Sequence, residues 1–214
     1  MKSKSPLAPK KNKNLNLFEG IRVSSTHCGL KKNKKLDLVL IKLDEPGSIL
    51  GSFTKSKTPG EPIIWNKSII KKKKVSAILI NSGNANVFTG PSGKKAILDI
   101  LNKLSFCLGI PKNQIFLAST GVIGEPLDSE KIIRKIPFLI KSLKNEILAW
   151  TKAADAIKTT DTYSKYHSEI VSRGESIFIN GIAKGSGMIQ PNMATMLGFI
   201  FTNFDILNKK VELG

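Results

Sequence analysis

The sequence predicts an α/β fold in which mixed β-sheets pack against layers of helices. Apolar, β-prone runs alternate along the chain with segments of helical periodicity, and no internal repeat is present. The chain has 214 residues, of which 41% are hydrophobic. We therefore expect it to bury one sizeable core or a large part of a bigger one.

Four short runs predict strands because they are apolar and rich in β-formers. These runs are Leu36–Leu43, Val75–Ile80, Ile115–Ala118 and Met196–Phe201. We expect Glu45-Pro46-Gly47 to end the first strand and the basic run 71–74 to form an exposed turn before the second. The last run is expected to be buried on both faces. Arg173–Glu175 predicts a hairpin turn before a further strand at Ile177–Ile179.

Helical periodicity is clearest from Ser92, the expected N-cap, to Leu108, with Gly109 as the C-terminal stop. Its apolar positions follow i, i+4, i+7 spacing: Ile97, Leu101, Leu104 and Leu108. A second helix is expected to start near Ser129 and to be kinked or divided at Pro137. A third is expected over 145–157.

The formal net charge of +18 raises the hypothesis of nucleic-acid binding. Nearly all of this charge is lysine, whereas arginine, the preferred residue for bidentate phosphate and guanine contacts, occurs only at positions 22, 134 and 173. The basic runs 10–11 and 71–74 have no interleaved aromatic residues. We therefore expect a solvated, lysine-rich surface and no nucleic-acid partner. A basic nucleic-acid-binding module remains an alternative, and it would bind in a strongly salt-dependent manner.

The remaining composition argues against several other classes of protein. Cys28 and Cys107 lie far apart, and no Cys/His spacing typical of a metal site is present, so two free thiols in a reducing compartment are expected. No run is long and apolar enough to cross a membrane. Residues 1–16 are lysine-rich and lack the apolar core of a signal peptide, which predicts a disordered tail. We expect a cytoplasmic protein, or an organellar one if the source is eukaryotic.

The most informative stretch is Gly181–Asn203, where a glycine- and proline-rich turn precedes Ala194-Thr195 and an apolar run. It presents a hydroxyl where a turn meets a strand, although an ordinary glycine-rich turn is the simpler interpretation of this segment alone. The only histidines, His27 and His167, stand outside any motif, so a Ser-His-Asp arrangement is not indicated. An N-terminal threonine needs no histidine, because its own α-amino group, with a pKa of about 8, takes the hydroxyl proton.

Three further motifs stand upstream of this stretch in a fixed order. They are NSGNAN at 81–86, STGVIG at 119–124 and AIKTTDT at 156–162. Together with KGSGMIQPNMATML at 184–197, they resemble the ornithine acetyltransferase family, also called the bifunctional glutamate N-acetyltransferases of arginine biosynthesis. The match runs from about Phe18 to the end of the chain.

The resemblance implies a fold of two sheets packed between helical layers and a self-processing N-terminal-threonine mechanism. Cleavage would occur between Ala194 and Thr195, when the Thr195 hydroxyl attacks the preceding carbonyl and water hydrolyses the resulting ester. Thr195 would then be the catalytic nucleophile and contact the substrate. The resemblance also implies that Thr120 and Gly121 form the oxyanion hole, and that Lys184 binds a substrate carboxylate.

Thr160 matches the family's other substrate-contacting threonine, with the adjacent Thr159 as the alternative register. The sequence departs from the family pattern at Ser164, where proline is frequent, and at Asn203, where aspartate is frequent. Family members are about twice as long. On this basis residues 17–194 correspond to the first subunit (α-chain), residues 195–214 open the second (β-chain), and the C-terminal half is absent.

The reaction that the resemblance implies is acetyl transfer from N2-acetylornithine to glutamate through an acetyl-Thr195 ester. Acetyl-CoA is a further donor in some relatives, and no metal or bound cofactor is implied. The expected partners are amino-acid substrates and the missing C-terminal chain, in a heterotetramer of two α and two β chains. The 214 residues alone are expected to be inactive. The alternative is an N-terminal-nucleophile amidase or aminopeptidase, which would transfer the acyl group to water.

Overall fold

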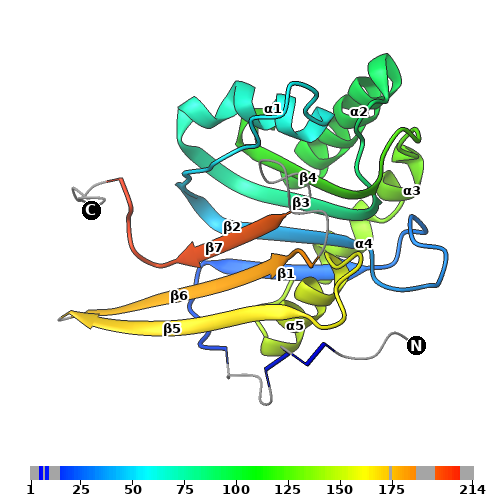
Figure 1. Cartoon of the computed structure of the whole chain (residues 1–214). Helices are drawn as coiled ribbons and strands as arrows, with labels where there is room; N and C mark the ends of the chain where they lie inside the picture. The colour runs from blue at the N-terminus through cyan, green and yellow to red at the C-terminus, as the bar shows by residue number, and fades with distance from the viewer. Residues whose placement is uncertain (1–4, 7, 10–14, 174, 187–195, 208–214) are drawn as a thin grey trace.

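The computed structural model describes residues 5–6, 8–9, 15–173, 175–186 and 196–207, with side chains 172–175 left out of the description (Figure 1). Two β-sheets form its centre. The first contains β1 (Ile21–Thr26), β2 (Leu38–Ser48), β3 (Lys74–Asn84) and β4 (Ile115–Val122) in that order. Strands β1 to β3 are antiparallel and β4 runs parallel to β3, so this sheet is mixed.

The second sheet is antiparallel and contains β5 (Lys165–Arg173), β6 (Glu175–Lys184) and β7 (Leu197–Thr202). Strands β5 and β6 form the hairpin that the sequence predicts, because Arg173 pairs with Glu175 across the turn. In Figure 1 the strands of the second sheet follow one another downward in the order β7, β6 and β5, with β7 next to β2 in the view.

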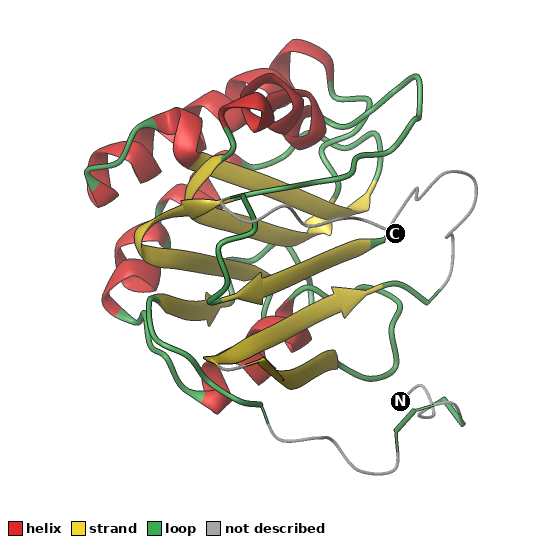
Figure 2. Ribbon diagram, turned by 90° about the vertical axis from the view of Figure 1, so that its left-hand side faces the viewer, coloured by secondary structure: helices red, strands yellow, loops and turns green. Residues whose placement is uncertain are grey.

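Five helices complete the described part of the chain. They are α1 (Glu61–Ile69), α2 (Gly90–Leu108), α3 (Ser129–Ile133), α4 (Ile136–Lys141) and α5 (Ile147–Ala156), with 3-10 turns at Ile70–Lys72 and Lys112–Gln114. Figure 2 shows most of them gathered on one side of the strands. None of the helices in these ranges has the length and apolar character that crossing a membrane requires.

Two apolar clusters hold the layers together. One lies between the first sheet and α2, α3 and α4, and it includes Leu38, Leu79, Leu101 and Leu139. The other lies on the opposite face of the first sheet, against α5 and the second sheet, and it includes Ile41, Ile80, Trp150 and Ile182. Because both faces of β3 are covered, its residues 75–82 are all buried. The α/β fold class with layered, mixed sheets is therefore confirmed.

Local corrections to the sequence prediction concern element boundaries. Helix α2 starts at Gly90 after Thr89, two residues before the predicted cap Ser92, whose hydroxyl instead donates to the Thr89 carbonyl at 2.7 Å. Strand β2 continues through Pro46 because a register shift between Lys42 and Gly47 accommodates it. Pro137 divides α3 from α4 as predicted, and strand β1 and helix α1 were not predicted.

Only one face of the Met196–Phe201 strand, which the sequence predicts to need burial on both faces, is covered by the described residues. Exposure alternates along β7: its inner face packs on the second cluster, where Phe201 meets Trp150 with ring centroids 5.1 Å apart. On the outer face Ile200 is 77% exposed, and the preceding Met196 is 49% exposed. The reason is that the described residues cover only one face of this sheet.

Residues 15 and 16 contact the second sheet and the core. Leu15 is buried, and the Asn16 backbone N–H donates to the Ser168 hydroxyl at 2.9 Å. The Asn180 side chain donates to the Asn16 carbonyl at 2.8 Å. The last two residues of the tail expected over 1–16 therefore contact the folded chain.

Candidate active site

The motifs at 81–86 and 119–124 meet at one edge of the first sheet. Strands β3 and β4 are parallel, and the register places Ser82 opposite Thr120 and Gly83 opposite Gly121. The carboxyl ends of parallel strands therefore bring both motifs together. Ligands in open α/β sheets bind outside this edge, which makes the Thr120-Gly121 turn a candidate site.

The asparagines of the first motif have a structural role at this edge. The Asn84 side chain donates to the Glu125 carbonyl at 2.9 Å and accepts the Asn86 backbone N–H at 2.8 Å. Asn81 accepts the Ser119 hydroxyl at 2.6 Å. These bonds fix the ends of β3 and β4 to each other and to the loop that follows β4.

Gly121 is required by geometry. Its φ is +138°, and a Cβ at this position would lie 2.3 Å from the Gly83 carbonyl carbon and 2.6 Å from the Asn84 nitrogen. Real Cβ atoms do not approach backbone this closely. The turn therefore depends on a glycine whose backbone lies against the neighbouring strand.

Lys184, at the end of β6, places its ammonium group at the same edge. The side chain is buried, and its Nζ donates to Thr120 Oγ1 at 3.0 Å and to Thr159 Oγ1 at 2.8 Å. An ammonium group only donates, so both hydroxyl oxygens accept. The Thr120 O–H is consequently left to donate to another group, which is the role that an oxyanion hole needs.

The charge of Lys184 is not neutralised by a directly bonded carboxylate among the described residues. Burial lowers the pKa of its ammonium group, the attraction of Asp161 partly opposes this, and the charge of Lys165 adds to it. Asp161 is instead bonded to Lys165. A buried cation of this kind suits an anionic ligand.

Asp161 ties the TTDT segment to the turn after β6. Its side chain is fully buried, and it accepts the Gly185 N–H at 2.9 Å. Burial raises the pKa of the Asp161 carboxyl, but the hydrogen bond from Lys165 and the Gly185 N–H outweigh burial and lower the pKa overall. The carboxylate therefore stays ionised and holds the turn in place.

The structure separates the two adjacent threonines of the TTDT segment. The Thr159 hydroxyl is bonded to Lys184, whereas Thr160 Oγ1 lies 3.0 Å from Ser186 Oγ. Thr120, Gly121, Thr159 and Lys184 thus form one cluster, and Thr160 lies next to it, in contact with Ser186 of the turn after β6.

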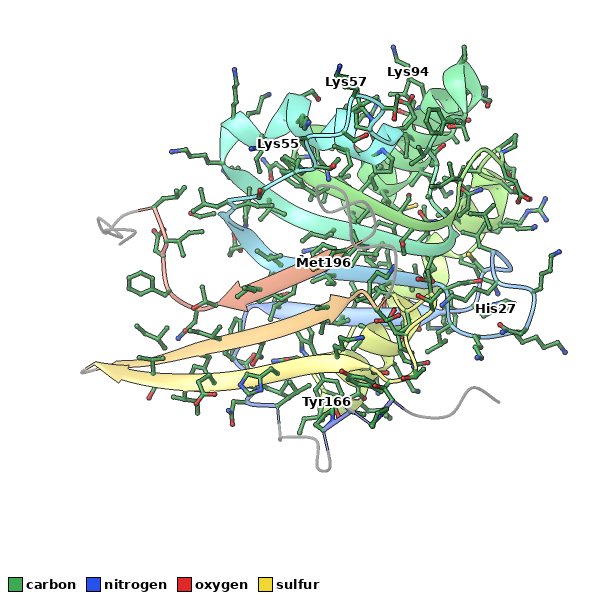
Figure 3. The ribbon with its side chains drawn as sticks, viewed as in Figure 1. His27, Lys55, Lys57, Lys94, Tyr166 and Met196 are labelled. Atoms are coloured by element: carbon green, nitrogen blue, oxygen red, sulfur yellow. The ribbon has the colours of Figure 1, made fainter. Side chains whose placement is uncertain are left out.

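Ala194 and Thr195, the predicted cleavage site and nucleophile, lie outside the described residues. The chain is described again from Met196, which Figure 3 labels. A Cβ on Gly185 would lie 3.5 Å from Met196 Cγ, and Lys184 pairs with Leu197 in the β6–β7 register. The residue bonded to Thr195 therefore lies beside the turn that Asp161 holds.

The two histidines lie away from this cluster. His27 Nδ1 is 2.8 Å from the Lys35 carbonyl, and His167 Nε2 is 3.0 Å from Glu169. Figure 3 labels His27 on the loop between β1 and β2. Across the described ranges, no group of three or more His, Cys, Asp or Glu side chains could hold a metal ion.

Sequence reasoning missed Asp161 and Lys165, which support the cluster. Their signal was present in the Asp of TTDT and in a lysine four residues later, but only the structure joins Asp161 to Gly185, 24 residues away.

The predicted free thiols are confirmed: Cys28 is buried and Cys107 half-buried. Lys55, Lys57 and Lys94 are exposed and lie on the helical side of the molecule in Figure 3.

The fold and the cluster define a layered α/β protein with a buried lysine and two threonines at the end of parallel strands. The ArgJ family model matches residues 22–213. The chain belongs to the ArgJ family.

Curated relatives and solved structures agree with this assignment. The chain is 41% identical over 203 residues to the arginine biosynthesis bifunctional protein ArgJ of Mesorhizobium japonicum, covering 94% of this chain and 49% of that protein. It is 42% identical over 203 residues to the ArgJ protein of Agrobacterium fabrum, with the same coverage. The chain thus spans about half the length of the curated relatives it matches.

Two crystal structures share the fold. The ArgJ protein of Bacillus halodurans aligns with a TM-score of 0.76 at 32% identity, covering 82% of this chain and 92% of that chain. Ornithine acetyltransferase of Mycobacterium tuberculosis, in complex with ornithine, aligns with a TM-score of 0.71 at 25% identity, covering 82% and 93%. The family resemblance that the motifs predicted is therefore confirmed.

Proposed function

We propose that this protein is a glutamate N-acetyltransferase that moves the acetyl group of N2-acetylornithine to glutamate in arginine biosynthesis. The observation that carries the proposal is the buried Lys184, bonded to Thr120 and Thr159 at the strand ends of an ArgJ-family chain. Both amino-acid substrates carry a carboxylate that an ammonium group can bind. The relatives favour this activity over the amidase or aminopeptidase alternative.

In the proposed reaction, Thr195 Oγ attacks the acetyl carbonyl carbon, and its proton passes to the α-amino group of Thr195. Negative charge develops on the carbonyl oxygen, where the Thr120 O–H and the Gly121 N–H donate hydrogen bonds. The amide C–N bond then breaks, and ornithine leaves with a proton. The glutamate amine attacks the acetyl ester, which releases N-acetylglutamate and restores the Thr195 hydroxyl.

Lys184 has two roles in this proposal. Its bond to Thr120 makes the hydroxyl oxygen an acceptor and directs the O–H toward the oxyanion. Among the described residues Lys184 has these two hydrogen-bond acceptors, which leaves its third N–H to bind the substrate carboxylate. We assign the neighbouring substrate contact to Thr159, because its hydroxyl is bonded to Lys184 at 2.8 Å, and we place Thr160 in the supporting contact with Ser186.

The test uses Thr195→Ala and, as a matched control that keeps a hydroxyl, Thr195→Ser in the purified protein. Thr195→Ala should give one uncut chain on a denaturing gel and no acetyl transfer, while Thr195→Ser should retain part of both. Two normal fragments from Thr195→Ala would exclude Thr195 as the nucleophile. Release of acetate from N2-acetylornithine at a rate that glutamate does not change would favour the hydrolase alternative.

We also propose that the active protein contains a second chain matching the remaining half of the relatives, in a heterotetramer of two α and two β chains. Support comes from the half-length match and from the exposed outer face of β7, where Ile200 is 77% exposed. The 214 residues expressed alone should lack activity, and co-expression with the remaining half should restore it. An active, monodisperse 214-residue protein would contradict this.

Because its relatives are named bifunctional, we propose acetyl-CoA as a second donor, which an assay with glutamate and acetyl-CoA tests.

A further inference from the structure

The loop between β1 and β2 closes around one buried carboxylate that the proposed reaction does not use. Asp37 has a fully buried side chain. Four consecutive backbone N–H groups, those of residues 28–31, donate to its two carboxylate oxygens over distances of 2.6–3.2 Å. Successive N–H groups that converge on an anion in this way form a nest, and charge-assisted bonds of this kind are strong. Asp37 therefore determines the shape of the loop.

His27 completes the ring of donors around Asp37. Its Nδ1 lies 2.8 Å from the Lys35 carbonyl oxygen and 3.1 Å from Asp37 Oδ2. Both neighbouring atoms are acceptors, so Nδ1 carries the proton in this arrangement. The Asp37 carboxylate thus contacts the partly exposed His27 side chain as well as the four backbone N–H groups.

The loop meets the oxyanion turn through Leu30. A Cβ on Gly83 would lie 2.9 Å from both the carbonyl carbon and the oxygen of Leu30, so the loop backbone packs directly on Gly83. Gly83 in turn lies against Gly121. The Asp37 carbonyl also accepts the Ser82 N–H at 2.8 Å. The loop therefore packs on Ser82 and Gly83 of β3 from the β2 edge, and the other edge of β3 pairs with the Thr120-Gly121 turn.

The same loop meets the TTDT segment through Lys31. Its Nζ donates to the Ala156 carbonyl at 2.9 Å, and the Ser82 hydroxyl donates to the same oxygen at 2.5 Å. Ala156 is the last residue of α5, three positions before Thr159. Burial lowers the pKa of Lys31 to about 8, against the attraction of Asp37. The buried ammonium group of Lys31 thus holds the C-terminal end of α5, which precedes Thr159.

We propose that Asp37 is a positioning residue that aligns both halves of the acetyl-transfer site: the oxyanion turn through Leu30 and Gly83, and Thr159 through Lys31 and Ala156. The expected effect of Asp37 on acetyl transfer rests on the proposed function, whereas its effect on the structure of the loop does not. Asp37 touches no reacting atom in this assignment. It holds the loop in the one shape that makes both contacts.

The experiment compares Asp37→Asn with Asp44→Asn in the purified protein. Asp44 lies on β2, the strand that begins directly after Asp37, and it pairs with the exposed Arg22, so it controls for loss of a nearby carboxylate. The first readout is hydrogen–deuterium exchange by mass spectrometry, in peptides covering residues 115–124 and 157–162, at a temperature where both variants are folded. The second is kcat and KM for acetyl transfer.

Asparagine preserves the shape of the side chain but turns an NH₂ group toward backbone N–H donors. Asp37→Asn should therefore speed exchange about tenfold or more in both peptides, while the distant β5–β6 hairpin exchanges as in the wild type. It should lower kcat/KM about 10²-fold, the loss typical of a misplaced catalytic geometry. The Asp44→Asn control should show neither effect. Unchanged exchange in 115–124 and an unchanged kcat/KM would overturn the proposal.

Lys31→Met separates the two contacts and keeps the test decisive if Asp37→Asn does not fold. It removes the bond to Ala156 and retains the nest around Asp37. Exchange should then rise in 157–162 and stay unchanged in 115–124, and a rise in neither peptide would overturn the Lys31 contact. Should the wild-type protein lack acetyl transfer even when it is co-expressed with the remaining half, the proposed function fails, while the exchange data still decide the positioning role.

Discussion

Replacing Gly121 by alanine tests the geometry of the oxyanion turn most directly. The added Cβ would stand 2.3 Å from the Gly83 carbonyl carbon and 2.7 Å from its oxygen. These are backbone atoms of a paired strand, so relief requires β3 and β4 to separate. Overpacking of this kind costs about 1–3 kcal/mol, and a side chain held at a strained φ costs about 1–3 kcal/mol more. The expected loss is about 2–6 kcal/mol of the free energy of unfolding, a large part of the roughly 5–15 kcal/mol available to a folded domain.

The matched control is Gly124→Ala. Gly124 also has a positive φ, +84°, but a Cβ there meets nothing within 4 Å. It therefore carries the backbone strain without the collision. Urea denaturation of both variants should show Gly121→Ala less stable than Gly124→Ala by about 1–3 kcal/mol, the overpacking share of the loss. Thermal scans should separate their midpoints in the same direction. Equal losses in the two variants would refute the close approach of β3 and β4 at this turn.

Three further predictions concern the chemistry of single groups. Thr120→Ala should lower kcat about 10²–10³-fold with KM nearly constant, with Thr120→Ser as the control that keeps the hydroxyl; an effect on KM alone would place Thr120 in the substrate pocket. Because burial lowers the pKa of Lys184 below its ordinary 10.5, the charged form that binds a carboxylate is lost at a lower pH than usual. KM for glutamate should therefore rise as the pH increases through the alkaline range, and Lys184→Arg, which stays charged, should flatten that rise; an unchanged rise would assign it to another group. Burial raises the pKa of the Cys28 thiol to about 12, so iodoacetamide at pH 8 should label Cys28 slowly in the native protein, and rapid labelling read by peptide mass spectrometry would contradict its burial.

Much of the fold could be predicted because its signals are local. Apolar runs predicted β2, β3, β4 and β7, and 3.6-residue periodicity predicted α2, ended by Gly109 at φ +65°. Helix α1 and strand β1 were missed because neither has a clear apolar period. The apolar run of β7 predicted a need for burial, but which of its faces is covered depends on the neighbours of the strand. Composition of the strand itself does not carry that information.

In the candidate site, too, the sequence indicated some residues and only the structure indicated others. Thr120, Gly121, Lys184 and Thr195 stand in motifs that the sequence alone brings to attention. The choice of Thr159 over Thr160 as the contact of Lys184 could not be made from adjacent identical residues, because it depends on which side chain faces β6.

The sequence by itself determined the α/β class, the order of most elements and the family to which the chain belongs, since these follow from patterns within short segments. Only the tertiary structure decided that Lys184 donates to Thr120, 64 residues earlier. It also showed that the loop around Asp37 packs behind both halves of the site. These contacts depend on how strands pair and layers pack, and side chains far apart in the chain become neighbours only when burial of the two apolar clusters brings their backbones together.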